Sequence, residues 1–174
     1  MVELVEQNFT ENKEEYNNVE KVLKTALGTQ VPIDHVGSTA IPNMVGKNII
    51  DVLVGAKDAQ QFSQFLEVIS NLGYLPSQNS KSEIYQFFAS HSGETSSGDT
   101  HIHLVIMNTE RYSEFLVLRN YLLANPDVAT QYSNHKKMLL QKGITNRKEY
   151  RNTKSEFVTQ LIKQAKEYKL KNKQ

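Results

Sequence analysis

The sequence contains no cysteine, no long hydrophobic run and no marked excess of charge of one sign. Without cysteine the chain cannot form a disulfide, a thiolate metal site or a cysteine nucleophile, and its composition suits a reducing compartment. No apolar stretch approaches the roughly 20 residues of a membrane span. The N-terminal segment also lacks the basic residues and apolar core of a signal peptide. We therefore expect a cytoplasmic protein with no membrane partner.

The charge balance argues against nucleic acid as a partner. The chain has 20 Lys and Arg residues and 19 Asp and Glu residues. The C-terminal segment 163–174 holds five Lys and one Glu, a surplus of +4, so the rest of the chain sums to −3. Duplex binding draws on a broad basic surface. The balance therefore disfavours nucleic acid and says nothing about the oligomeric state.

The pattern of apolar residues predicts a mixed α/β (α+β) protein with one domain over residues 1–174. The predicted core, about 1–108, alternates helices and strands, and predicted helices fill about 109–170. A polar loop is expected at 91–100. The expected helices cover 10–26, 58–72, 110–123, 126–142 and 147–168, and the expected strands cover 31–36, 49–54, 83–89 and 101–107.

The stretch HVGSTAIPNMVGKNIIDVLV (35–54) is the most informative part of the chain. Gly37 and Ser38 directly follow a predicted strand, where backbone N–H groups and a hydroxyl can hold a phosphate. Asp51 lies inside the next predicted strand, whose other residues are apolar. A strand carboxylate beside a Gly-Ser loop can bring a metal ion and a phosphate together. The alternative is a simple turn next to a hydrogen-bonded structural aspartate.

The same stretch resembles the GrpB family, whose hallmarks are H-[IV]-G-S-T-A and a K-x-I-I-D strand. These correspond here to residues 35–40 and 47–51. The segments THIHLVI (100–106), LRNYLLANPD (118–127), QYSNHKK (131–137) and EYRNTKSEFV (149–158) are similar to the family's later blocks. The resemblance implies the nucleotidyltransferase fold of the polymerase-beta-like group: a mixed β-sheet core with helices packed on it and a C-terminal helical layer. The backbone of Gly37, Ser38 and Thr39 is the candidate anion-binding site, and His35 could join the same pocket or simply orient the loop.

The sequence departs from the nucleotidyltransferase pattern at the acidic site. That superfamily has a D-x-[DE] strand motif, and Leu53 stands here where the second acid belongs. Residues two apart share one face of a strand, so Asp51 lacks its expected partner on that face. A two-Mg²⁺ transfer site needs several acidic ligands, and the sequence therefore disfavours standard two-metal chemistry.

Two histidines offer other chemistry. His101 and His103 are two apart on a predicted strand, so both rings project from one face and could approach Asp51. Asp51, His101 and His103 are thus the candidate ligands of a divalent metal, Mn²⁺, Zn²⁺ or Mg²⁺, with histidine ligation favouring the first two. Asp51 and His103 are the candidate catalytic residues, because a histidine can also serve as a base or a phosphate partner. The alternative is a pair of half-exposed strand histidines bonded to backbone.

The predicted C-terminal helices carry a second set of candidates. Tyr132 and Lys136 are four residues apart, as are Tyr150 and Lys154, so each pair shares a helix face. A tyrosine ring can stack on a base while lysine meets a phosphate. The opposite possibility is that these side chains pack their stems and solvate their tips. Two further candidates for phosphate contact are Arg119 and Lys47.

The resemblance and the residues together predict a nucleotidyltransferase-like protein that binds a nucleotide or another phosphate-containing small molecule. Metal-dependent nucleotidyl or phosphoryl transfer would then use an atypical acidic site. The alternative is a non-catalytic ligand-binding or folding-accessory domain, as the family's fusions to dephospho-coenzyme A kinase imply. The family usually carries arginine in the segment equivalent to 85–88, and its absence here weakens the case for a polyphosphate ligand.

Overall fold

The computed structural model describes residues 1–90 and 99–172 of the chain. Most of the predicted loop 91–100 therefore lies outside the described residues. The longest helix has 25 residues, yet no described helix is long and apolar enough to cross a membrane. The elements in chain order are β1 (Val5–Glu6), α1 (Phe9–Leu27), β2 (Ile33–Val36), a 3₁₀ turn η1 (Ser38–Ala40), β3 (Val45–Gly46), β4 (Ile50–Ala56), α2 (Ala59–Asn71), β5 (Leu75–Ser82), β6 (Tyr85–Ala89), β7 (Thr100–Ile106), α3 (Glu110–Ala124), α4 (Pro126–Gln141) and α5 (Arg147–Lys171).

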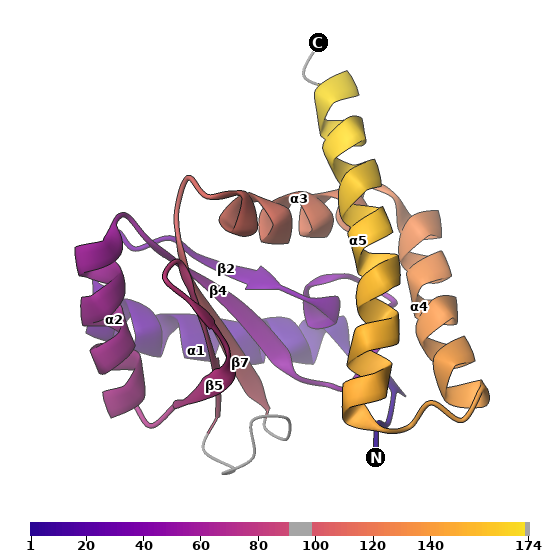
Figure 1. Ribbon diagram of the computed structural model, residues 1–174, viewed down its shortest axis with the longest axis horizontal. Coiled ribbons are helices and arrows are strands. Elements are labelled where there is room, and N and C mark those ends of the chain that lie inside the picture. Colours follow the sequence, from indigo (N-terminus) through magenta and orange to yellow (C-terminus); the bar gives the residue numbers. More distant parts are fainter. Residues whose placement is uncertain (91–98, 173–174) are drawn as a thin grey trace.

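A five-stranded mixed sheet forms the centre of the fold, with strand order β2-β4-β7-β6-β5. β4 and β7 run parallel, and every other neighbouring pair is antiparallel. β1 and β3 form a separate two-stranded ribbon. The predicted fold class, a mixed sheet with helices packed on it and a C-terminal helical layer, is confirmed (Figure 1).

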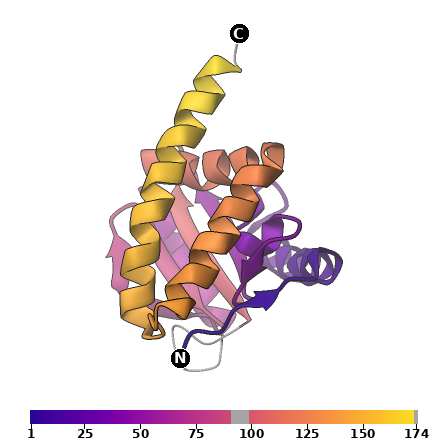
Figure 2. The ribbon, with the colours of Figure 1, turned by 90° about the vertical axis from the view of Figure 1, so that its right-hand side faces the viewer.

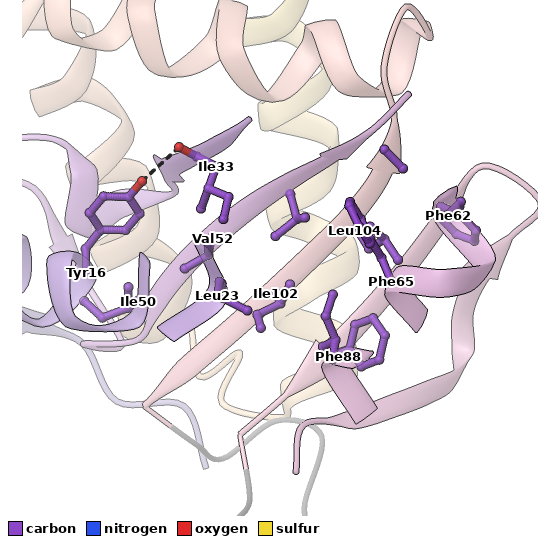
Figure 3. Close-up of a cluster of buried hydrophobic side chains, with 13 residues drawn as sticks. Tyr16, Leu23, Ile33, Ile50, Val52, Phe62, Phe65, Phe88, Ile102 and Leu104 are labelled. Carbon is purple, nitrogen blue, oxygen red and sulfur yellow. Dashed lines mark hydrogen bonds between the residues drawn. The ribbon is translucent and has the colours of Figure 1, made fainter. Parts of the chain in front are cut away.

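The main hydrophobic core lies between one face of the sheet and helices α1 and α2. Alternate residues of the strands, such as Val52 and Leu104, meet Leu23 of α1 and Phe65 of α2 in one buried cluster (Figure 3). The Tyr16 hydroxyl of α1 donates a hydrogen bond of 3.1 Å to the carbonyl of Ile33. The period-two alternation of β4 sends the remaining side chains, among them Asp51, to the opposite face.

The opposite face of the sheet is covered by α3. A smaller buried cluster joins Val36, Leu53 and Val105 of the strands to Phe115 and Leu116 of α3. α4 and α5 lie side by side in front of the sheet (Figure 2). They pack on one another and on α3 through a separate apolar cluster. This arrangement brings the three C-terminal helices beside the face of the sheet that carries Asp51.

Local sequence signals explain where the helices begin and end. Asp58 caps α2, with its side chain accepting from the backbone N–H of Gln61 at 2.8 Å. Gly28 ends α1 with a positive φ of 111°. Asn8 caps α1, because its side-chain oxygen accepts from the N–H groups of the second and third residues that follow it.

Three strands were not expected from the sequence. β5 reads LPSQNSKS, with only one buried side chain and a proline near its start. It lies at the edge of the sheet, pairs only with β6 and shifts register along its length. Proline is tolerated in an edge strand, where one side needs no hydrogen-bonding partner. β1 and β3 have two residues each, too few for a period to be detected.

Candidate functional site

Asp51 lies at the centre of the candidate site, on β4 between two neighbouring strands. Val36 of β2 is opposite it on one side and His101 of β7 on the other. The strands predicted at 31–36 and 49–54 are thus neighbours in the sheet. Leu53 shares the face of Asp51 and is fully buried in the apolar cluster below α3.

The two histidines of β7 both turn toward the Asp51 carboxylate. His101 Nδ1 and His103 Nε2 each lie 3.3 Å from the same oxygen, Asp51 Oδ1. A carboxylate only accepts, so each ring nitrogen donates. The other nitrogen of His103, Nδ1, lies 3.0 Å from the hydroxyl of Tyr85, which donates to it. Four side chains from three adjacent strands thus form one hydrogen-bonded chain.

Burial and the hydrogen bonds of this network together set the charges of Asp51 and His103. Burial alone would raise the pKa of Asp51, but the hydrogen bonds from His101 and His103 outweigh burial and hold that pKa far below its usual range. Burial lowers the pKa of His103, although Asp51 partly opposes the effect. Asp51 is therefore ionised and His103 is neutral near pH 7.

The Gly37-Ser38 loop lies against the other oxygen of Asp51. Gly37 has φ of +74°, and a Cβ on it would stand 2.2 Å from Asp51 Oδ2. Only glycine allows both that backbone conformation and this close approach. Ser38 Oγ faces Gly46, where an added Cβ would lie 2.3 Å away. The structure thus places Gly37, Ser38 and Asp51 in one cleft.

A cavity of about 860 Å³ opens from this cleft toward the C-terminal helices. The described residues that line it include nine Lys and Arg side chains and one carboxylate, Asp51. The whole chain has 20 Lys and Arg against 19 Asp and Glu, so almost half of its basic residues surround one cavity. These nine residues, here called the basic cluster, are Lys47, Lys81, Arg111, Arg119, Lys136, Arg147, Lys148, Arg151 and Lys154.

Lys136 of α4 lies deepest in the basic cluster. It is 4% exposed, it donates to the carbonyl of Val45, and its ammonium lies 4.8 Å from the centre of the Tyr132 ring. Burial, reinforced by the charge of Lys154, lowers the pKa of Lys136 to about 7, while Asp51 opposes the shift. Lys136 is thus a buried amine whose charged form has little local compensation.

Half-buried Lys154 and exposed Lys47 are affected by some of the same charges. Desolvation lowers the pKa of Lys154, with Asp51 acting against the shift and Arg151 adding to it. Desolvation and then the charge of Lys154 lower the pKa of Lys47, and Asp51 again opposes the change. All three lysines therefore experience the field of the same single carboxylate.

Two predicted ligand contacts do not line the cavity, His35 and Thr39. Alternation along β2 turns His35 to the opposite face, where its ring stacks on Tyr16 at a centroid distance of 4.5 Å. Its Nε2 lies 2.9 Å from the Thr39 hydroxyl, which donates to the carbonyl of Ile49. Burial also lowers the pKa of His35 to about 4. The two side chains support the Gly37-Ser38 loop from behind and do not offer direct contacts.

Other predicted residues line the cavity but are already engaged. Arg119 Nη1 donates to Asp34 Oδ1 at 2.8 Å and to the carbonyl of His35 at 3.1 Å, so this arginine secures the end of β2. The Tyr132 ring packs on Phe157 at 5.7 Å. Tyr150 is 3% exposed and belongs to a buried apolar cluster. Neither tyrosine presents a free ring face of the kind expected for stacking on a base.

Sequence reasoning missed several residues of the site. The hydroxyl of Tyr85 extends the Asp51 network. Arg111 lies over the rings of Tyr85 and Phe115 at 4.8 and 5.0 Å, so α3 supplies a cation beside the segment that lacks the family's arginine. Arg147 and Arg151 were also missed. With Lys154 they have the i, i+4, i+7 spacing of one helix face, which was visible in the sequence.

The donors present do not fit a two-metal site. Both histidine nitrogens nearest Asp51 already donate to one oxygen, and Leu53 occupies the position of a second acid. Over residues 1–90 and 99–172 no group of three or more His, Asp or Glu side chains could hold a metal ion. The predicted set of Asp51, His101 and His103 therefore has the geometry of a hydrogen-bonded network.

Solved structures place this architecture among known folds. The structure of the conserved protein GrpB from Enterococcus faecalis aligns with a TM-score of 0.81 and 26% identity, over 95% of this chain and 99% of that one. A structure of Cid1, an RNA terminal uridylyl transferase by its description, aligns with a TM-score of 0.56 and 15% identity, over 81% of this chain and 43% of that one. The second likeness concerns the fold alone, and it confirms the predicted nucleotidyltransferase fold.

Proteins of similar sequence point to the same family. The glutamate-rich protein GrpB of Alkalihalophilus pseudofirmus is 32% identical over 152 residues, which cover 84% of this chain and 86% of that protein. The UPF0157 protein YqkA of Bacillus subtilis is 30% identical over 148 residues, and the match spans only 42% of its length. The family model described as GrpB protein matches residues 1–164. The chain therefore belongs to the GrpB family.

Proposed function

We propose that this protein binds a nucleotide or another phosphate-bearing small molecule in the cavity beside Asp51. The charge of the described cavity wall carries the proposal, because nine basic side chains and one carboxylate line it. The volume of about 860 Å³ falls within the range of small-molecule sites. Buried cations are costly without counter-charge, so an anionic ligand would recover part of that cost.

A binding role fits the site better than nucleotidyl transfer. Transfer of this kind relies on acidic groups that hold metal ions at the phosphates, and Leu53 occupies the second acidic position. The hydrogen-bonded chain from Tyr85 through His103 to Asp51 would instead set the shape and polarity of the cavity floor. We therefore infer a ligand-binding protein on a nucleotidyltransferase scaffold.

Isothermal titration calorimetry with a panel of anions tests this proposal. The panel comprises ATP, GTP, CTP, UTP, dephospho-coenzyme A, pyrophosphate and inorganic phosphate, with adenosine as the uncharged comparison. We expect at least one phosphate compound to bind and adenosine to fail. Failure of every phosphate compound, with and without divalent metal, would refute the proposal.

Paired variants on α5 link binding to the cavity. Arg151→Met with Lys154→Met removes two members of the basic cluster, whereas Lys163→Met removes an exposed lysine of the same helix. We expect the double variant to weaken phosphate binding on the order of tenfold or more and to reduce its salt sensitivity, since charged contacts are lost. The Lys163 control should bind like the wild type. Equal binding by all three proteins would remove α5 from the site.

A further inference from the structure

Charge in the cavity is arranged in the opposite way from a metal-dependent phosphate site. In such sites clustered carboxylates hold divalent cations, and the cations meet the phosphates. Here one carboxylate is surrounded by nine basic side chains, a formal balance of +8 among the described lining residues. One of these side chains, Arg119, is also paired with Asp34. An anion of several charges fits this balance.

The surroundings of Asp51 oppose the entry of a divalent cation. Its Oδ1 accepts from two imidazole rings, and a Cβ built on Gly37 would lie only 2.2 Å from its Oδ2. A metal ion there would displace those hydrogen bonds. It would also bring a charge of +2 toward the ammonium groups of Lys136 and Lys154, both of which interact electrostatically with Asp51.

The basic cluster brings cations from several elements to the wall of one cavity. The ammonium group of Lys136 donates to the carbonyl of Val45 and lies over the ring of Tyr132. Lys154 and Arg151 approach from α5, and Arg111 approaches from α3 over its two aromatic rings. Cations from several elements can thus meet a chain of phosphates, as arginine and lysine do at many phosphate sites.

We infer that the cavity takes a di- or triphosphate as the free polyanion, with lysine and arginine side chains in the role that divalent metal ions have in nucleotidyltransferases. This inference rests on the proposed function and specifies its ligand class. Affinity should rise with the number of phosphate charges, from phosphate to pyrophosphate to tripolyphosphate. Magnesium should weaken binding, because it neutralises the ligand that the basic cluster recognises.

Calorimetry with pyrophosphate, tripolyphosphate and ATP, each in EDTA and in excess MgCl₂ or MnCl₂, tests the inference. We expect binding in EDTA and a loss on the order of tenfold when metal is added, equivalent to about 1.4 kcal/mol. Binding that appears only with metal would overturn the inference and leave the proposed function intact. Absence of binding in every condition would overturn both.

Asp51→Asn provides a second readout, measured at pH 6, which lies below the pKa of about 7 of Lys136. Without the one negative charge of the described cavity wall, free ATP in EDTA should bind several-fold more tightly, whereas a metal-dependent site would lose its ligand affinity. Thermal melting establishes that the variant is folded. If Asp51→Asn does not fold, Lys154→Met serves as a second variant. Lys154→Met should weaken ATP binding in EDTA on the order of tenfold. Weaker binding by Asp51→Asn, or unchanged binding by Lys154→Met, would overturn the inference.

Discussion

Replacing Lys136 by methionine should stabilise the protein, and the gain should depend on pH. Burial and Lys154 lower the pKa of Lys136 from 10.5 to about 7. Each tenfold change in proton affinity is worth about 1.4 kcal/mol, so the charged form costs the folded state roughly 5 kcal/mol below pH 7. The lost hydrogen bond to Val45 offsets about 1 kcal/mol of the gain. Lys136→Met should therefore add about 4 kcal/mol to the free energy of unfolding at pH 6.

The sign of the pH dependence follows from where the proton is held. Between pH 7 and 10.5 the unfolded chain keeps the proton on Lys136 and the folded protein has released it. Stability contributed by this group therefore rises with pH across that window, because the unfolded state binds more protons. The advantage of Lys136→Met should be largest below pH 7 and should vanish near pH 10.5.

Urea unfolding followed by circular dichroism, from pH 6 to pH 10 in phosphate-free buffer of constant ionic strength, measures the effect. Phosphate is omitted because a bound anion would stabilise the wild type by mass action. Lys163→Met is the matched control, since that lysine is exposed on α5, and its stability should follow the wild type at every pH. A Lys136 variant that is less stable than wild type at pH 6, or a difference independent of pH, would refute the reasoning.

Three further substitutions test the packing of the site and the core. Gly37→Ala should cost clearly more stability in urea unfolding than Gly143→Ala. Both glycines have φ between 70° and 80°, but only a Cβ at Gly37 meets other atoms within 4 Å, so the control should cost about 1 kcal/mol. Tyr85→Phe should cost about 1 kcal/mol and shift the ring resonances of His103 in NMR spectra, because it removes the hydroxyl that donates to that ring. Phe88→Ala should cost about 3–5 kcal/mol in urea unfolding, since Phe88 is fully buried in the main core.

The central strands and the helices could be predicted because their patterns are local. β4 and β7 are apolar runs interrupted by single polar residues, and α2 carries a clear apolar stripe. β5 has no such pattern, because an edge strand with one buried side chain is defined by its pairing with β6. Tertiary pairing of this kind leaves no signal in the segment itself.

The centre of the site could be predicted and the basic cluster could not. The period of two on β7 predicted that His101 and His103 would project together toward Asp51, and both do. The basic cluster combines residues from strands, loops and three helices that are distant in sequence. A formal net charge of +1 gives no hint of such clustering, because the compensating acids lie elsewhere on the molecule.

Asp51 has a role in this cavity even without a metal ion. It opposes the lowering of the pKa of Lys47, Lys136 and Lys154, so it favours the charged form of each ammonium group before a ligand arrives. It also repels that ligand. In Asp51→Asn both effects disappear together, and pH separates them.

Low pH favours the protonated form of Lys136 even without Asp51, so at pH 6 the loss of repulsion should dominate and a polyanion should bind more tightly than to the wild type. Above pH 7 Lys136, which faces Lys154 and no longer Asp51, loses its proton more readily, so the gain in affinity should shrink as the pH rises. Titration of pyrophosphate in EDTA across pH 6 to 8 measures this trend. A gain that stays constant with pH would mean that Asp51 acts on the ligand alone and not through the protonation of Lys136.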